Sequence, residues 1–443
     1  MIRVMKKATI IALIVLMFPF LGLAGNSKAY AAENSLKLDV AAAILIDAKT
    51  GKVLYEQNAD EMLAVASMSK MLTEYLVLEA IHEGKITWDQ EVIISEFIHK
   101  LSSPNLNVST VGLTQGEAYT VKELYESMAI HSANASTVAL AELIAGTEEK
   151  FVEMMKEKAE ELGLEDFHLV NSTGLNNSDM LGNHPEGTDV NDENKMTARA
   201  VAKLAYHLIK DYPEVLDTAS VPELHFRDGR VYYNFNWMLP GLVHEYKGVD
   251  GLKTGSTELA GYNFTGTVER NGQRFITVVM KAKSQSHRFE ETRKLMDYAF
   301  NNFSEQEIFP ANSMIEEMDT VPVLKGKKDS VKIKTKDPLR LVIKNGDEES
   351  YKPKLVLNKD LLNDKGELVA PVKEGTAIGY LTYEYVGDEK DYGFIEPDKL
   401  TKVDVIASET VEKANWFVLM LRGIGGFFTN LWNSIVTTVT GWF

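Results

Sequence analysis

A serine and a lysine three residues apart could form a nucleophile and its base. Residues 67–70 read SMSK at the start of a helical pattern, so the i, i+3 spacing places Ser67 and Lys70 on one helix face. A hydroxyl is a poor nucleophile unless a neighbouring base takes its proton. A lysine can act as that base when burial or a second cation lowers its pKa from the usual value of about 10.4. The pair therefore predicts covalent catalysis by Ser67 with Lys70 as base.

Two further motifs could complete such a site. In SAN, residues 132–134, the Ser132 hydroxyl can relay a proton and the Asn134 amide can hold a substrate amide. In KTGS, residues 253–256, a cation and two hydroxyls suit a substrate carboxylate. These carboxylate-binding groups are Lys253, Thr254 and Ser256.

The third motif has two additional expected roles. Lys253 would be the second cation that lowers the pKa of Lys70. Gly255 would let the substrate backbone approach closely, because glycine has no side chain.

Each motif is weak evidence by itself, because the chain contains decoys. A second KTG at 49–51 is interpreted as a hairpin turn, and a second S-x-N at 103–105 as a loop. The specificity therefore comes from the complete set in one chain.

Composition narrows the alternatives. The 443 residues carry a formal charge of −17, which disfavours nucleic-acid binding through phosphates. There are no cysteines, so the nucleophile must be a hydroxyl. The nine histidines form no H-E-x-x-H pair, and no G-x-S-x-G occurs, so a metal peptidase and a histidine triad lack support. The length predicts two or three domains.

The pattern of apolar residues predicts an α+β domain with an antiparallel sheet, followed by a small all-β domain. Asn271-Gly272 predicts a hairpin. The first third of the β domain is basic, which is interpreted as a solvated strand face. The expected strands are 40–47, 52–56, 261–268, 274–280, 330–335 and 339–344, and the expected helices are 68–81, 121–145, 151–162 and 289–300.

Both ends of the chain are predicted to be directed to a membrane. A basic start, an apolar run and an A-x-A site predict a secretory signal peptide cleaved after Ala31, in preference to an uncleaved anchor. In residues 410–443, apolar and aromatic side chains recur at steps of three and four, without the roughly 20 apolar residues of a span. An amphipathic helix in the membrane interface is expected, and a helix packed on the protein's own core is the alternative. The predicted regions are 1–31 signal peptide, 32–308 catalytic domain, 309–407 small β-rich domain and 408–443 amphipathic anchor helix.

The motif set resembles a known family. The order S-x-x-K, S-x-N, K-T-G is similar to that of serine β-lactamases and penicillin-interacting peptidases. The chain is identified as a member of the low-molecular-mass D-alanyl-D-alanine carboxypeptidases of the penicillin-binding protein 5 type, peptidase family S11. The segments that carry the resemblance are ASMSKM at 66–71, GEAYTV at 116–121, HSAN at 131–134 and DGLKTGST at 250–257.

The resemblance implies a serine β-lactamase/transpeptidase-like domain and a role for each motif residue. Ser67 would be acylated, Lys70 would be its base, and the N–H groups of Ser67 and Ser256 would form the oxyanion hole. Some relatives carry histidine at the position of Ser256. Ser132 and Asn134 would complete the proton network and position the peptide. The substrate carboxylate would be bound by Lys253, Thr254 and Ser256. Arg288 would help near that carboxylate, and the alternative for Arg288 is a surface salt bridge.

The resemblance also implies partners and a location. The substrate would be a peptidoglycan stem peptide ending in D-Ala-D-Ala, and β-lactam antibiotics would acylate the same serine. No metal or organic cofactor and no nucleic acid are implied, and the partner of the β domain is unknown. The protein would lie outside the cytoplasm, attached to the outer face of the cell membrane.

Two rival functions fit parts of the sequence. A class A β-lactamase has a glutamate in an E-x-x-L-N segment, where this chain has Ser172 in the stretch 172–176. That difference predicts a long-lived penicilloyl-enzyme. A non-catalytic wall-binding protein would not need the complete set of motif residues.

Overall fold

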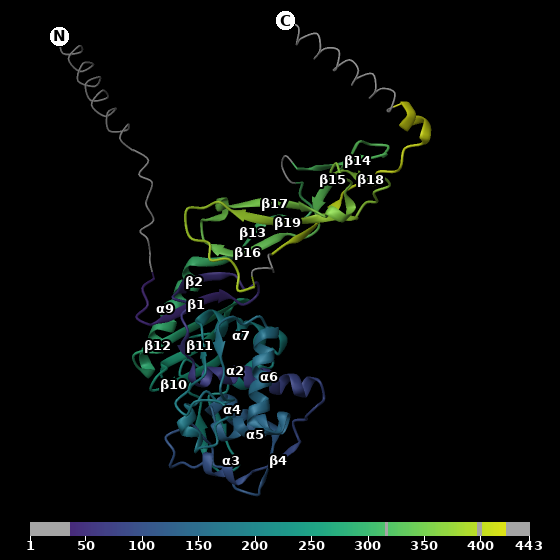
Figure 1. Cartoon of the computed structure of the whole chain (residues 1–443). Coiled ribbons are helices and arrows are strands. Elements are labelled where there is room, and N and C mark those ends of the chain that lie inside the picture. The colour runs from purple at the N-terminus through teal and green to yellow at the C-terminus, as the bar shows by residue number, and fades with distance from the viewer. Residues whose placement is uncertain (1–35, 315–317, 397–400, 422–443) are drawn as a thin grey trace, which may run out of the picture. The chain divides into compact units, whose positions relative to one another are not determined.

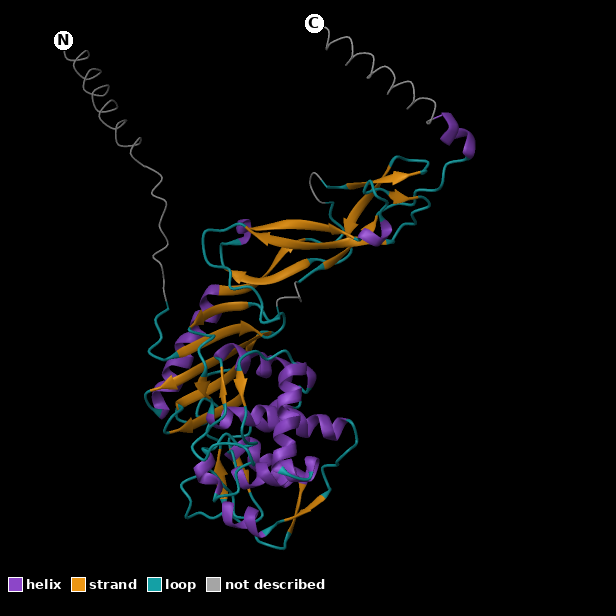
Figure 2. Ribbon diagram, viewed as in Figure 1, coloured by secondary structure: helices purple, strands orange, loops and turns teal. Residues whose placement is uncertain are grey.

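A five-stranded antiparallel sheet forms the centre of the first domain, in the order β10-β11-β12-β1-β2 (Figures 1 and 2). The computed structural model describes residues 36–314, 318–396 and 401–421. The described residues from 38 onward belong to one compact unit. The elements of the first domain are, in order, β1 (Ala42–Asp47), β2 (Val53–Gln57), β3 (Leu63–Ala64), the 3-10 turn η2 (Ala66–Ser69), α2 (Lys70–His82), β4 (Glu91–Ile93), α3 (Glu96–Leu101), β5 (Ala118–Thr120), α4 (Val121–His131), α5 (Asn134–Ala145), α6 (Glu148–Glu161), β6 (Phe167–His168), η3 (Asn177–Met180), β7 (Lys195–Met196), α7 (Ala198–Asp211), α8 (Val215–Ala219), β8 (Glu223–His225), β9 (Val231–Tyr233), β10 (Val249–Thr257), β11 (Gly261–Arg270), β12 (Gln273–Ala282) and α9 (Gln285–Asn302).

Helices cover both faces of this sheet. Successive residues of a strand point to opposite faces, and in these strands both sets of side chains are apolar. In β12, Ile276 and Val278 belong to the core shared with the helical cluster, whereas Phe275 contacts Phe300 of α9. The hairpin between β11 and β12 turns at Asn271 and Gly272, as predicted. The α+β architecture is therefore confirmed.

One predicted helix is wrong. Residues 121–145 form two helices, α4 and α5, because the backbone of Ser132 is left-handed, with φ of 56°. Ser132 ends α4, and Ala133 is extended before α5 begins at Asn134. The apolar periodicity continues through this break, and no Gly or Pro marks it. The break places the second motif between two helix ends.

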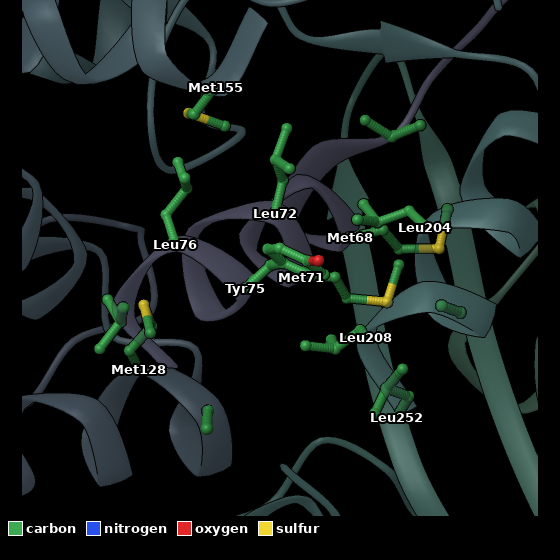
Figure 3. Packing of buried hydrophobic residues seen from close by; sticks show 14 of the residues in the cluster. Met68, Met71, Leu72, Tyr75, Leu76, Met128, Met155, Leu204, Leu208 and Leu252 are labelled. Atoms are coloured by element: carbon green, nitrogen blue, oxygen red, sulfur yellow. The ribbon is translucent and has the colours of Figure 1, made fainter. Parts of the chain in front are cut away.

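Helix α2 lies in the middle of the core. Nearly all of its residues are buried, which is typical of a helix that is packed on every side. Figure 3 shows its apolar side chains and those of neighbouring elements: Met71, Leu72, Tyr75 and Leu76 from α2, Met128 from α4, Met155 from α6, Leu204 and Leu208 from α7, and Leu252 from β10. A polar residue on α2 is therefore held in an apolar environment.

The second domain is all-β, as predicted. It contains one sheet in the order β17-β19-β20-β15-β14-β18 and a pair β13-β16. Basic residues on its strands are exposed, for example Lys332 of β15 and Arg340 of β16, which pairs with Glu307, and this confirms a solvated strand face. Its elements are β13 (Phe303–Phe309), β14 (Thr320–Leu324), β15 (Ser330–Thr335), β16 (Leu339–Lys344), η4 (Glu348–Ser350), β17 (Tyr351–Leu357), η5 (Lys359–Leu361), β18 (Leu368–Val369), β19 (Ala377–Tyr385) and β20 (Val403–Ala407).

A buried lysine joins the two domains. The side chain of Lys52, 4% exposed, donates a hydrogen bond of 2.9 Å to Asp391. Its ammonium group also lies 5.4–5.5 Å from the centres of three aromatic rings, those of Tyr351, Tyr383 and Phe394. Cation–π contacts of this kind strengthen when they are shielded from water. The backbone of residues 51–53 hydrogen-bonds residues 393–395 beside it.

The described part of the C-terminal tail is short. Residues 416–421 are helical and expose apolar side chains, with Trp416 at 74% exposure. Among the residues that the structure describes, no helix is long and apolar enough to cross a bilayer. The predicted signal peptide and the rest of the predicted anchor helix lie outside the described residues.

Candidate active site

The first motif places Lys70 directly against Ser67. The Lys70 ammonium group donates hydrogen bonds of 3.0 Å to Ser67 Oγ, 2.7 Å to Asn134 Oδ1 and 2.6 Å to the carbonyl of Thr173. Ser67 lies in η2 and Lys70 begins α2, so the predicted one-turn spacing is confirmed. The hydrogen bonds to Asn134 and Thr173 hold the Lys70 amine next to the serine hydroxyl.

The pKa of Lys70 lies well below its ordinary value. Burial is the largest cause, and the charge of Lys253 lowers the pKa further, whereas the carboxyls of Glu74 and Glu148 raise it. Both causes that the sequence predicted are present. A lysine in this environment can be neutral and can take the proton of Ser67.

The second motif contributes a side-chain amide that binds Lys70 and a hydroxyl without a partner. Asn134 accepts from Lys70 and donates through Nδ2 to the carbonyl of Ser109 at 2.9 Å, which fixes the orientation of its amide. Ser132 Oγ is buried and has no hydrogen-bond partner in the described parts of the chain. An unpaired buried hydroxyl is available to a reacting group.

The third motif lies on strand β10. Lys253 and Thr254 are buried, and Ser256 is exposed. Burial lowers the pKa of Lys253 to about 8, with Glu74 raising it and Arg288 lowering it. The amine is therefore mainly a cation at neutral pH, which suits a carboxylate ligand.

Gly255 allows a close approach within the protein, and the approach of a substrate backbone at this glycine stays a prediction. A Cβ atom at this position would lie 2.4 Å from the carbonyl oxygen of Val65 and 3.1 Å from the backbone nitrogen of Ser67. The close approach is thus between β10 and η2 within the protein. It brings the backbones of Ser67 and of the third motif together, as an oxyanion hole formed by Ser67 and Ser256 requires.

Arg288 is buried behind the third motif, and it forms no salt bridge with any residue that the structure describes. Its guanidinium group donates to the carbonyl of Asn263 at 3.4 Å and lies 4.7 Å from the ring centre of Phe289. Burial lowers its pKa to about 10, and its charge acts on Lys253. The alternative of a surface salt bridge is therefore wrong.

Residues 172–174 also belong to the site, and the sequence motifs did not predict this. Thr173 binds Lys70 through its carbonyl, and Ser172 donates to the buried carboxyl of Glu148 at 2.7 Å. Gly174 was the residue in the sequence that could have indicated this packing. A Cβ atom at Gly174 would lie 2.0 Å from the carbonyl oxygen of Ala66. That glycine allows the segment to pack closely against η2.

Family comparison identifies the fold and chemistry. The family model of D-alanyl-D-alanine carboxypeptidases matches residues 28–284, and that of the penicillin-binding protein 5 C-terminal domain matches residues 303–413. The chain belongs to the D-alanyl-D-alanine carboxypeptidase family. The three motifs described above all lie within the stretch that matches the carboxypeptidase model.

Individual relatives agree over most of the length of this carboxypeptidase. It is 31% identical over 392 residues to D-alanyl-D-alanine carboxypeptidase DacF of Bacillus subtilis (strain 168), covering 88% of this chain and 91% of that protein. The crystal structure of PBP3, a peptidoglycan synthesis regulatory factor from Streptococcus pneumoniae, aligns with a TM-score of 0.70 and 36% identity over 85% of this chain and 100% of that one. Penicillin binding protein 5 from Haemophilus influenzae aligns with a TM-score of 0.66 and 28% identity over 85% and 98%.

Proposed function

We propose that this carboxypeptidase removes the terminal D-alanine from peptidoglycan stem pentapeptides through an acyl-enzyme on Ser67. The observation that supports this most directly is the 3.0 Å hydrogen bond between Lys70 Nζ and Ser67 Oγ. The lowered pKa of Lys70 supports the same reading, because a neutral amine is required to accept the serine proton.

The geometry suggests a two-step reaction. Neutral Lys70 takes the proton of Ser67 as its Oγ attacks the penultimate D-Ala carbonyl, and the N–H groups of Ser67 and Ser256 receive the oxyanion. The C–N bond breaks and D-alanine leaves after its nitrogen has gained a proton. Ser132, whose hydroxyl is unpaired and buried, is placed to pass that proton. Water then cleaves the ester and restores Ser67.

The substrate carboxylate would be recognised by the third motif. Lys253 supplies the charge, and Thr254 and Ser256 supply hydroxyls from the same strand. Arg288 adds positive charge from behind Lys253. A terminal carboxylate and the bicyclic carboxylate of penicillin present the same charge to these groups.

Mass spectrometry after incubation with benzylpenicillin tests this function. A single penicilloyl adduct is expected on Ser67, and Ser67→Ala should carry none. The adduct should persist for many minutes, because Ser172 stands where a class A β-lactamase has its glutamate and the nearby Glu148 carboxyl is bound to Ser172. A folded protein without an adduct would refute the function, and rapid complete hydrolysis of penicillin would favour the β-lactamase alternative.

We further propose that the enzyme works at the outer face of the cell membrane, exported by residues 1–31 and attached by residues 410–443. The exposed apolar side chains at the start of the tail support this: Trp416, Phe417, Met420 and Leu421. They have the character of a helix that lies in a membrane interface.

Truncation of the tail tests the attachment. Val411 and Ala414 are buried in the β domain, so the cut is best placed after Asn415. The truncated enzyme should move from the membrane pellet to the soluble fraction and keep its penicillin acylation rate. Retention of the truncated enzyme in the pellet after signal cleavage would contradict anchoring by the tail.

A further inference from the structure

A buried carboxyl lies one helical turn beyond Lys70. Glu74 follows Lys70 at i+4 and Ser67 at i+7, so all three project from the same side of η2 and α2. The Glu74 residue is 2% exposed, and its Oε1 has no hydrogen-bond partner in the described residues. A carboxyl in the middle of an apolar core lowers stability unless it is compensated. Its retention calls for a role beyond packing.

The surroundings of Glu74 are positively charged on the side of the active site. Burial raises the pKa of its carboxyl, and the charges of Lys253 and Lys70 both lower that pKa and so favour the ionised form. Burial and the charge of Glu74 raise the pKa of Tyr125 on α4, whose buried hydroxyl also lacks a partner in the described residues. The other charged groups that act on members of this cluster are Glu148 on Lys70, Arg288 on Lys253, and Glu214 on Tyr125.

Without a counter-charge, two neighbouring buried amines could not both be cations at low cost, because burial and their mutual repulsion lower both pKa values. The reaction needs Lys70 neutral before attack and cationic after it has taken the proton of Ser67. Carboxylate recognition needs Lys253 charged throughout. A negative group behind both amines supports the charge on Lys253 and stabilises the ammonium that develops on Lys70.

We propose that Glu74 is a positioning residue that acts through Lys70 and Lys253, as the shared counter-charge that sets their protonation during acylation. This role rests on the proposed function, in which Lys70 is the base. It differs from a packing role because its loss would change the pH profile, which an effect on packing alone would leave in place.

The expected signature of Glu74→Gln is a displaced pH profile. Glu74 raises the pKa of both amines, so its neutralisation lowers both. The acid limb, where Lys70 loses its proton, and the basic limb, where Lys253 loses its charge, should both move to lower pH. At a separation of one helical turn, the shift is expected to be on the order of one pH unit. The maximum rate should fall several-fold, because Lys70 becomes a weaker base.

The experiment is the acylation rate of the full chain by a fluorescent penicillin, measured by stopped flow between pH 5 and pH 10. Glu74→Asp keeps the charge and should keep the limbs near those of the wild type. Glu79→Gln, on the same helix and paired with Lys158, is the matched control and should change neither limb. If Glu74→Gln does not fold, Glu74→Met, which suits an apolar core, should show the same shift.

The outcomes separate this inference from the proposed function. A wild type that is not acylated contradicts the function itself. A wild type that is acylated, with a folded neutral variant whose limbs are unchanged or moved to higher pH, contradicts the role of Glu74 alone. Circular dichroism and the melting temperature of each variant establish that it is folded.

Discussion

Replacement of Lys70 by methionine is expected to slow the acylation of Ser67 by about 1,000-fold at neutral pH, because a positioned general base contributes about 100- to 10,000-fold. Among the described residues, Lys70 is the side chain that hydrogen-bonds Ser67 Oγ. Methionine fits a buried position and cannot accept a proton. The variant should therefore fold with a defective nucleophile.

The pH dependence of the Lys70→Met variant carries the sharper information. In the wild type, the rate rises as pH passes upward through the lowered pKa of Lys70, since the neutral amine is the reactive form. Without that amine, the acid limb should disappear. The measurement is the stopped-flow acylation rate against pH, and a variant that keeps both the rate and the limb would contradict Lys70 as base.

The Lys70→Met variant needs a control for structural damage. The substitution leaves Asn134 Oδ1 and the Thr173 carbonyl without their donor, which costs about 1–3 kcal/mol for each group. Lys203→Met removes a comparable hydrogen bond, 2.6 Å long, to the carbonyl of Gly163 away from the site. It should lower the melting temperature and leave the acylation rate unchanged.

Replacement of Lys253 by methionine is expected to reduce kcat/KM for a peptide ending in D-Ala-D-Ala by about 100-fold, because charge-assisted hydrogen bonds contribute about 1.5–3 kcal/mol. The loss should appear mainly in KM, since the carboxylate is bound before and during the reaction. Esterification or amidation of the substrate carboxylate should have the same effect on the wild type and little further effect on the variant.

The Lys253 variant should also move the acid limb, in the direction opposite to Glu74→Gln. Lys253 lowers the pKa of Lys70, so its removal raises that pKa and shifts the limb to higher pH. Lys283→Met, which removes an exposed lysine paired with Asp39, is the control and should change neither KM nor the limb. An unchanged KM in the folded Lys253→Met variant would contradict carboxylate binding at this lysine.

Much of the site could be predicted from the sequence, because its residues occur in short local patterns. The spacing of Ser67 and Lys70 defines their geometry once a helix is assumed, and the lowered pKa of Lys70 follows from burial and from Lys253. The hairpin at Asn271-Gly272 could be predicted because its left-handed backbone favours those residue types.

The features that were missed depend on contacts between distant segments. The carbonyl of Thr173 meets Lys70 across 103 residues of sequence, and a backbone carbonyl leaves no mark on residue type. The left-handed Ser132 breaks a helix without a glycine, because the tertiary structure and not local propensity requires the turn. Glu74 reads as an ordinary helix residue until the burial of α2 is known.

The contact around Lys52 has a consequence for the way the molecule avoids self-association. Strand β2 is the last strand of the central sheet, and its outer backbone groups would be open to pairing with a strand of another copy. The segment around Phe394 forms an isolated antiparallel bridge with Lys52 at the start of that border, through the hydrogen bonds of residues 51–53 to residues 393–395. The β domain thus covers the first backbone groups of the sheet border, and a chain that stopped after α9 would leave these groups open to pairing with a strand of another copy.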